Sequence, residues 1–204
     1  MTALPRQHGL YFPSIEAFLS HEFEDDLPRE LVDGIAVAHA ALSPEHGRIV
    51  ANLSRAIGNA LNQAGSRCFV EAGSGVEPRR RRRRPTYRVP EVLIRCPTAE
   101  SGDSQHPAIV IEVLSPSNTA SEMGDKARDY KSIPSIRQII HIAQDRFLCS
   151  FQRRAGDLWI VEDIEGRDAA LSLDGLDIAI PLALVYENVP VRDEAAASAP
   201  EPSG

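Results

Sequence analysis

The sequence is poor in aromatic residues and cysteine, and it lacks long apolar runs. Aromatic side chains make up 5% of the 204 residues, with a single tryptophan, which argues against a stacking platform for single-stranded bases. Cys68, Cys96 and Cys149 contain no C-x-x-C pair, so we expect three unpaired thiols, as in a reducing cytoplasm. No apolar run approaches the roughly 20 residues of a membrane span. The first eight residues lack the apolar segment of a secretory signal, so we expect a cytoplasmic protein without membrane contact.

Several familiar enzyme signatures are also missing. The chain has no Walker A motif, no Rossmann glycine pattern and no G-x-S-x-G elbow, which argues against the nucleotide-binding and hydrolase classes that depend on them. What is present is an ordinary globular composition, 43% hydrophobic and 25% charged, with a net charge of −7. This length predicts a single domain over residues 1–192, followed by a disordered, acidic tail rich in Ala and Pro over 193–204.

Local patterns predict alternating helices and strands. Asp33-Gly34 between two apolar runs indicates a hairpin over 30–37, and Ser43-Pro44 opens a helix that Gly65 ends. Thr119 and Glu122 form a capping box. The expected helices cover 14–20, 43–65 and 119–131, and the expected strands cover 67–71, 90–95, 108–114, 136–142, 147–151, 158–161 and 171–180. This order predicts an α+β or α/β fold, a mixed sheet with helices packed on it and with an added N-terminal hairpin and C-terminal strands.

Two carboxylates stand within or beside apolar runs that are expected to be strands. Glu112 interrupts the run from Ile109 to Leu114, and a carboxylate in a buried strand is costly unless it is paired, protonated or bound to a metal. Glu91 begins the strand over 90–95. If these strands are neighbours, the two acids share one sheet edge, where like charges need a cation between them. Oxygen ligands of this kind favour Mg²⁺ or Mn²⁺ over zinc.

Lys126 is the candidate basic partner of these acids. The chain has 20 arginines but only two lysines, Lys126 and Lys131. Lys126 follows Glu112 by fourteen residues on the next expected helix, where an ammonium can orient a water and stabilise developing negative charge. The structural alternatives are an i, i+4 pair between Glu122 and Lys126, worth roughly 0.3–0.5 kcal/mol, and an arginine partner for Glu112. The rarity of lysine favours the functional interpretation.

A run of six arginines is the candidate nucleic-acid contact. These cations can neutralise several phosphates and make DNA affinity fall steeply with salt. The alternative is a solvated, exposed loop over 79–85 without a ligand. The run consists of Arg79, Arg80, Arg81, Arg82, Arg83 and Arg84.

These motifs resemble those of a known group of enzymes. The order Pro90-Glu91, Glu112 and Lys126 looks like the P-D…(D/E)-x-K signature of the restriction-endonuclease-like nucleases. Each motif alone is weak, but five in the right order over residues 28–155 are specific for the bacterial endonuclease family called Uma-two. The five segments are Glu30-Leu-Val-Asp-Gly34, Ser43-Pro-Glu-His46, Pro90-Glu-Val-Leu93, Ile111-Glu-Val-Leu-Ser-Pro-Ser117 and Glu122-Met-Gly-Asp-Lys126-x-x-x-Tyr130.

The resemblance implies a restriction-endonuclease-like core and Mg²⁺- or Mn²⁺-dependent hydrolysis of DNA phosphodiester bonds. It gives the metal to Glu91 and Glu112, with the backbone carbonyl of Val113. It gives the basic role to Lys126, because Leu114 occupies the usual lysine position. It further implies double-stranded DNA as substrate and a homodimer, since cutting both strands needs two sites. Supporting residues near the site are Glu30, Glu45, His46 and Tyr130.

Two positions depart from the family pattern. Glu91 stands where the family has aspartate, and we expect its extra methylene to move the metal by around an ångström, a displacement large enough to matter for chemistry. Ala143-Gln144 stands where family members often have Asp-Pro. The first departure leaves open an alternative function. In that alternative the chain is a catalytically impaired binding module of the same fold, which recruits nucleic acid or an acidic partner through the arginine run.

Overall fold

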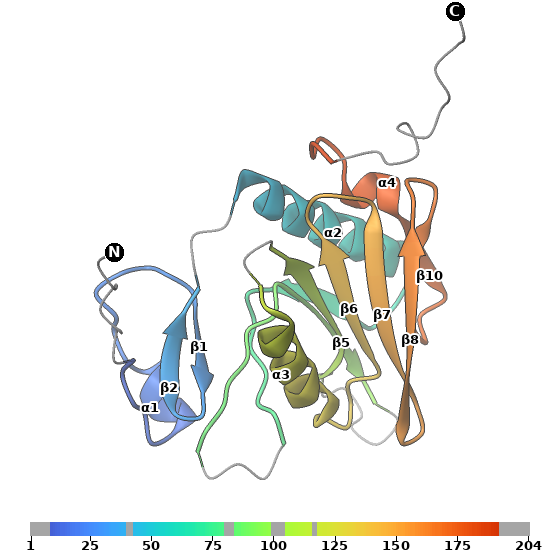
Figure 1. Ribbon diagram of the computed structural model, residues 1–204. Coiled ribbons are helices and arrows are strands. Elements are labelled where there is room, and N and C mark those ends of the chain that lie inside the picture. The colour runs from blue at the N-terminus through green and yellow to red at the C-terminus, as the bar shows by residue number, and fades with distance from the viewer. Residues whose placement is uncertain (1–8, 40–42, 80–83, 99–104, 116–117, 192–204) are drawn as a thin grey trace, which may run out of the picture.

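A six-stranded mixed sheet forms the centre of the computed structural model (Figure 1). Its strand order is β3-β4-β5-β6-β7-β8, and every neighbouring pair is antiparallel except β5 and β6. The structure describes residues 9–39, 43–79, 84–98, 105–115 and 118–191. The strands are β3 (Phe69–Ala72), β4 (Val92–Pro97), β5 (Gln105–Leu114), β6 (Gln138–Ala143), β7 (Leu148–Ala155) and β8 (Leu158–Glu165).

Helix α2 (Pro44–Gln63) covers one face of this sheet (Figure 1). It begins at Ser43, whose hydroxyl accepts a hydrogen bond from the His46 amide, as an N-cap does. Its buried side chains recur at helical spacing and pack against alternate residues of β4, β5 and β6. The short elements β9 (Ala170–Leu173), β10 (Ile178–Pro181) and α4 (Leu182–Val185) add to the same core.

Helix α3 (Ala120–Lys131) covers the opposite face of β5 (Figure 1). The capping box of Thr119 and Glu122 forms as the sequence predicts. Tyr130 is fully buried in a second cluster with Leu93, Val110 and other residues of the sheet. Because successive strand residues point to opposite faces, Glu91, Glu112 and the residue paired with Glu112 on β6 lie on this α3 face.

An N-terminal unit lies beside the sheet (Figure 1). It consists of helix α1 (Ile15–Leu19) and the hairpin of β1 (Arg29–Val32) and β2 (Ile35–Ala38). The hairpin turns at Asp33 and Gly34, both at positive φ, as the Asp-Gly pair predicts. The unit is tied to the rest of the chain by reciprocal backbone hydrogen bonds between Leu31 and Tyr87.

The expected fold class is confirmed: the chain has a mixed sheet flanked by helices, with the added hairpin and the C-terminal strands. Several boundaries differ: Glu91 lies one residue before β4 rather than within it, β5, β7 and β8 are longer than expected, and the strand expected over 171–180 is the pair β9 and β10. The arginines at 80–83 and the tail over 193–204 lie outside the described residues. None of the helices among the described residues combines the length and the apolar character of a membrane span.

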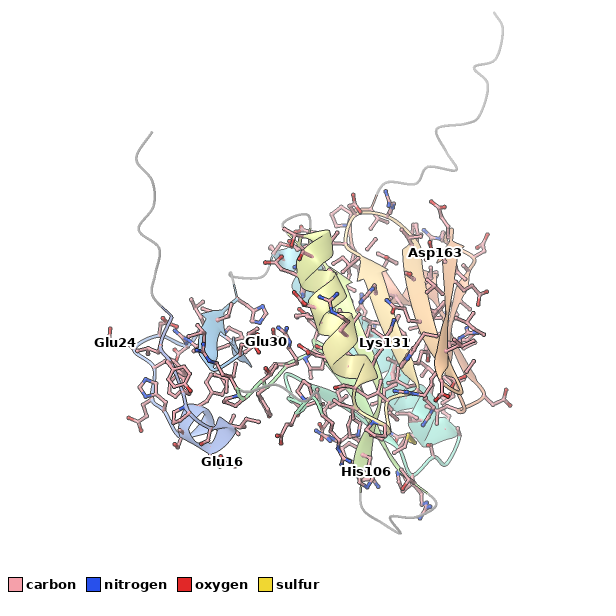
Figure 2. The ribbon with its side chains drawn as sticks, turned by 60° about the horizontal axis from the view of Figure 1, so that its bottom comes forward. Glu16, Glu24, Glu30, His106, Lys131 and Asp163 are labelled. Carbon is pink, nitrogen blue, oxygen red and sulfur yellow. A yellow bond between two sulfur atoms is a disulfide. The ribbon has the colours of Figure 1, made fainter. Side chains whose placement is uncertain are left out.

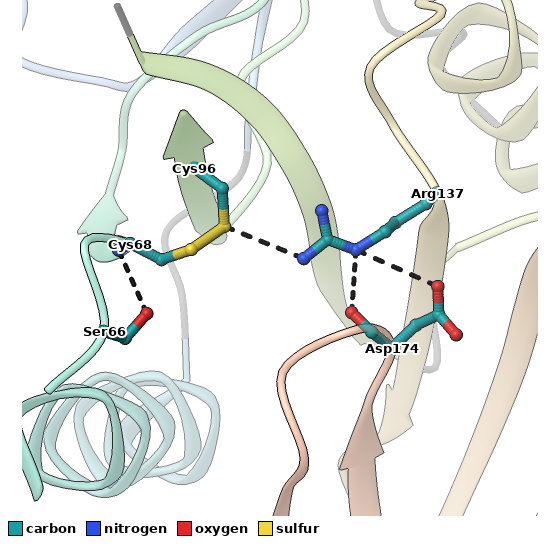
Figure 3. The surroundings of a disulfide bond; sticks show 5 residues. All are labelled: Ser66, Cys68, Cys96, Arg137 and Asp174. Carbon is teal, nitrogen blue, oxygen red and sulfur yellow. Dashed lines mark hydrogen bonds and ion pairs between the residues drawn. A yellow bond between two sulfur atoms is a disulfide. The ribbon is translucent and has the colours of Figure 1, made fainter. Parts of the chain in front are cut away.

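The expectation of three unpaired thiols is wrong. Cys68 and Cys96 form a disulfide bond (Figure 3). The β3–β4 register pairs Phe69 with Arg95, so one step further along the ladder Cys68 lies opposite Cys96, with a Cα–Cα distance of 4.2 Å. Sequence spacing alone does not reveal this pairing, because it depends on the strand register. Only Cys149 is a free, buried thiol. The cysteines therefore do not support the inference that the protein resides in a reducing compartment.

Reduction of this disulfide is expected to lower the free energy of unfolding by about 3–4 kcal/mol, since the bond closes a loop between residues 28 apart and restricts the unfolded chain. Urea unfolding with and without a phosphine reductant measures the loss. A Cys68→Ser/Cys96→Ser variant should have the same free energy of unfolding as the reduced protein, and the reductant should not change it. Three reactive thiols in unfolded, unreduced protein would contradict the pairing.

Candidate active site

The sheet register brings Glu91 and Glu112 together. Val92 of β4 pairs with Ile111 of β5, so the next antiparallel position sets Glu91 opposite Glu112. Both side chains face α3, Glu112 is 3% exposed, and the two carboxyls interact directly. The two acids that the sequence placed on neighbouring strands therefore share one site.

Helix α3 supplies two partners to Glu112, one turn apart. The Lys126 Nζ atom lies 3.1 Å from Oε1 and 3.2 Å from Oε2 of Glu112. The Tyr130 hydroxyl donates a hydrogen bond to Oε1 of the same carboxyl. The spacing of four residues places both side chains on the helix face above β5. Lys126 therefore points into the site, not toward Glu122 on the helix surface, whose carboxylate accepts hydrogen bonds from Thr119.

Glu30 enters the site from β1, on the side of the hairpin that faces α3 (Figure 2). Its Oε1 lies 3.3 Å from Lys126 Nζ and accepts a hydrogen bond from the Val89 amide at 3.0 Å. Its Oε2 lies 2.8 Å from Arg88 Nη1. Arg88 also binds Asp129 of α3 at 2.8 and 2.9 Å. The N-terminal hairpin and α3 are thus joined by a buried network of charges.

Two further predicted residues lie at the start of α2. His46 is 3% exposed, and its Nε2 lies 3.3 Å from Oε1 of Glu91, so it does reach the acids. Glu45, one residue earlier, has no contact with these carboxylates among the described residues. Val113 follows Glu112 on β5 with its side chain in the core beneath α2, and the metal-binding role of its carbonyl stays a prediction.

The surroundings of Glu112, Glu91 and Lys126 shift the pKa values of these side chains in different directions. Burial and the negative charge of Glu91 raise the pKa of Glu112 well above its usual value, and Lys126 only partly offsets them. Burial would also raise the pKa of Glu91, but hydrogen bonding to His46 and the charge of Lys126 lower it. For Lys126, the three carboxylates outweigh burial and raise its pKa to about 12. The site therefore holds a lasting ammonium beside one carboxyl whose pKa is raised and one whose pKa is lowered.

His141 is a member of the site that sequence reasoning missed. It pairs with Glu112 in the parallel β5–β6 register, faces α3, and is 9% exposed. Burial and the positive charges of Lys126 and Lys131 lower its pKa to about 4, so the imidazole is neutral. The sequence does contain a signal for this residue, because His141 interrupts the apolar run of β6 in the same way as Glu112 interrupts the apolar run of β5.

This histidine makes the fold sensitive to mild acid. In the unfolded chain His141 takes up a proton near pH 6.5, whereas in the fold it does so only near pH 4. The unfolded state is therefore favoured as the pH falls through this window, by about 2 kcal/mol between pH 7 and pH 5. We expect a His141→Leu variant to lose this part of the pH dependence in urea titrations. An unchanged difference between pH 7 and pH 5 would contradict the burial of a neutral imidazole.

The donor set can be tested for its fit to a divalent cation. No three His, Cys, Asp or Glu side chains in the described ranges converge as a metal cluster, so the protein would supply only the two carboxylates, Glu91 and Glu112. Mg²⁺ is commonly held by one or two carboxylates, with waters and substrate phosphates completing its shell. Glu91 Oε2 is buried and, when both acids are ionised, has no hydrogen-bond donor among the described residues. The two carboxylates therefore fit such an ion.

Only two of the six consecutive arginines can be placed. The backbone amide of Arg79 donates to the Ser132 hydroxyl at 3.0 Å, just after α3. The Arg84 guanidinium lies over the Tyr11 ring, 5.7 Å from its centroid. Arg80, Arg81, Arg82 and Arg83 lie outside the described residues, so the predicted contact of this run with DNA stays a prediction.

The sheet, its flanking helices and the convergence of two acids with a lysine define a restriction-endonuclease-like nuclease fold. The protein-family model Uma2, described as "Putative restriction endonuclease", matches residues 15–184. The chain belongs to this family, which confirms the resemblance seen in its motifs.

The chain is also similar to two individual proteins. A crystal structure of a protein described as a putative nuclease belonging to DUF820, from Anabaena variabilis, superposes with a TM-score of 0.65 over 84% of this chain and 96% of the other, at 14% identity. This similarity establishes the fold. An uncharacterized protein of Synechocystis sp. is 24% identical over 184 residues, which is 87% of this chain and 94% of that protein.

Proposed function

We propose that this nuclease-family protein is an endonuclease that hydrolyses phosphodiester bonds of double-stranded DNA with the help of Mg²⁺ or Mn²⁺. The observation that carries the proposal is the position of Lys126, whose ammonium meets both oxygens of Glu112 beside Glu91. Glu91 and Glu112, with the Val113 carbonyl, would hold the ion. When bound there, a divalent cation supplies Lewis-acid stabilisation of a phosphoryl group and makes water more acidic.

Other residues of the chain would bind the substrate or orient the catalytic groups. Lys126 stays cationic at working pH, so it can bind a phosphoryl oxygen and stabilise negative charge that develops there. Glu30, itself held by Arg88 and Val89, orients the ammonium. Tyr130 fixes one oxygen of Glu112 through its hydroxyl. The arginine run would bind backbone phosphates, and two copies of the chain would cut the two strands.

The proposal is tested by cleavage of supercoiled plasmid with Mn²⁺, with Mg²⁺ and without a divalent ion. We expect nicked or linear products only with the metal, and loss of these products in a Glu112→Gln variant, which keeps the side-chain shape but removes the charge. Glu162→Gln, at an exposed position on β8, is the matched control and should cleave as the wild type does.

Two outcomes would overturn this function. Metal-dependent cleavage that survives Glu112→Gln would place the chemistry elsewhere or in a contaminant. No cleavage by the wild type, together with no Mn²⁺ binding in calorimetry, would favour the binding module that lacks catalysis. A homodimer is tested in the same preparation by light scattering with and without a short duplex.

A further inference from the structure

Glu91 is the acid of the site that borders a cavity. The cavity has a volume of about 160 Å³ and lies where β2, α2, the end of β3 and the segment before β4 meet. Its walls include Val50, Ala72, Val89 and Pro90, together with the polar residues Glu91 and His39. The hollow therefore adjoins the carboxyls that would act on a phosphodiester.

The cavity has mostly apolar walls and a few polar groups. The lining is mostly apolar, and its polar groups are Glu91 and His39, which both also contact the acid cluster. His39 Nε2 is buried without a hydrogen-bond partner in the described structure and lies 3.6 Å from Glu30. Because Glu91 Oε2 is buried without a donor among the described residues, and an unpaired buried polar atom is unfavourable, the Glu91 wall of the cavity favours an occupant with a polar edge, and the apolar walls favour apolar faces elsewhere.

Size and lining restrict that occupant. Pockets for whole small-molecule ligands have volumes of roughly 300 Å³ or more, so this cavity holds one ring-sized group. The described wall contains no Phe, Tyr or Trp side chain, and its one aromatic ring is the small His39 imidazole beside Glu30, whereas base recognition relies mainly on stacking against larger aromatic faces. A deoxyribose ring is small, carries mostly C–H groups on its faces, and is bonded directly to the phosphate that would react.

We propose that this cavity binds the deoxyribose adjoining the scissile phosphate and thereby selects DNA over RNA. The inference rests on the proposed function and deepens it by assigning a sugar subsite. Ribose carries a 2′-hydroxyl, and a hydroxyl that packs against the apolar side chains of Val50 and Val89 loses part of its hydrogen bonding to water without replacement. An apolar wall discriminates against an added hydroxyl only modestly, by about 10- to 100-fold.

The test uses two probes that differ only at the 2′ position and contain no internucleotide bond, deoxyuridine 3′,5′-bisphosphate and uridine 3′,5′-bisphosphate. In calorimetry with Mn²⁺ present, we expect the wild type to bind the deoxy compound at least about tenfold more tightly, as one unpaired hydroxyl predicts. Ala72→Phe fills the cavity and should weaken binding of the deoxy compound at least about tenfold, by loss of the sugar contacts.

A matched variant controls for the added ring. Ala72 and Ala155 are both the exposed last residues of their strands, β3 and β7, and Ala155→Phe should bind both probes as the wild type does. Should Ala72→Phe unfold, Val89→Phe fills the cavity from another wall. Far-ultraviolet circular dichroism shows whether each variant is folded.

The outcomes separate this inference from the function on which it rests. Equal binding of the two probes would overturn the sugar assignment, and unchanged binding by a folded Ala72→Phe would overturn the cavity as the subsite. If plasmid cleavage depends on Glu112 yet Ala72→Phe cleaves with wild-type KM, the function stands and the subsite is wrong. If the wild type does not cleave DNA at all, the proposed function fails and the subsite fails with it.

Discussion

A Lys126→Met variant is expected to bind Mn²⁺ about tenfold more tightly than the wild type, because a close positive charge is removed from the ion site. The Lys126 ammonium lies within hydrogen-bond distance of both oxygens of Glu112. An incoming cation must displace it from those lone pairs and is also repelled by it. Methionine keeps most of the side-chain volume and removes the competitor.

The same variant is expected to cleave DNA about 10²–10³-fold more slowly, the usual cost of removing one group that stabilises transition-state charge. A gain in ion affinity together with a loss of cleavage is specific to Lys126 acting on the substrate. Simple damage to the site would weaken both. Calorimetry with Mn²⁺ and single-turnover plasmid cleavage measure the two quantities.

The chain offers a matched control in its only other lysine. Lys131 ends α3, where its Nζ lies over the Trp159 ring, 5.2 Å from the centroid, and makes no described contact with Glu112. Lys131→Met should leave Mn²⁺ affinity and cleavage near wild-type values. If Lys126→Met binds Mn²⁺ no better than Lys131→Met does, the ammonium and the ion do not share the carboxylate, and our placement of the metal is wrong.

The central part of the site could be predicted because it follows from local patterns and strand order. Glu112 within an apolar strand, Glu91 before another, and Lys126 on the capped helix are visible in the sequence. The register between Val92 and Ile111 then brings the acids together. The structure shows these contacts, while the catalytic roles stay predictions.

The surroundings of the site could not be predicted to the same extent, because they depend on contacts between distant segments. Arg88 is one of 20 arginines, and no periodicity shows that it binds Asp129, 41 residues away. Cys68 and Cys96 pair only through the strand register. His141 was detectable in principle, as a polar residue inside an apolar strand, but its neighbours could be known only from the parallel pairing with Glu112.

Arg88→Met is expected to lower the free energy of unfolding by about 3–5 kcal/mol, the cost of breaking a buried ion pair by removing one partner. Arg88 is 5% exposed, and its partners Glu30 and Asp129 are 2% and 0% exposed. Methionine fills much of the space but leaves both acids with one cation fewer in a site that water barely reaches. Urea unfolding followed by circular dichroism measures the loss.

Two comparison variants show that burial and geometry, rather than charge alone, set this cost. Arg55 pairs with Glu187 at the surface, both side chains being well exposed, so Arg55→Met should cost at most about 1 kcal/mol. Arg88→Lys should recover only part of the loss, since an ammonium cannot reproduce the fork that binds two carboxylates at once. Equal losses in Arg88→Met and Arg55→Met would contradict the network.

The position of Arg88 gives this loss a functional consequence. Arg88 holds Oε2 of Glu30, whose Oε1 in turn lies 3.3 Å from Lys126. Without Arg88 the hairpin that carries Glu30 is held less firmly against α3, so the ammonium loses part of its orientation. In urea-free buffer a folded Arg88→Met should therefore cleave more slowly than Arg55→Met while its Mn²⁺ affinity stays close to that of the wild type, because Glu91 and Glu112 are positioned by the sheet and not by Arg88. A weakened affinity equal to the loss of cleavage would show instead that the whole site had loosened.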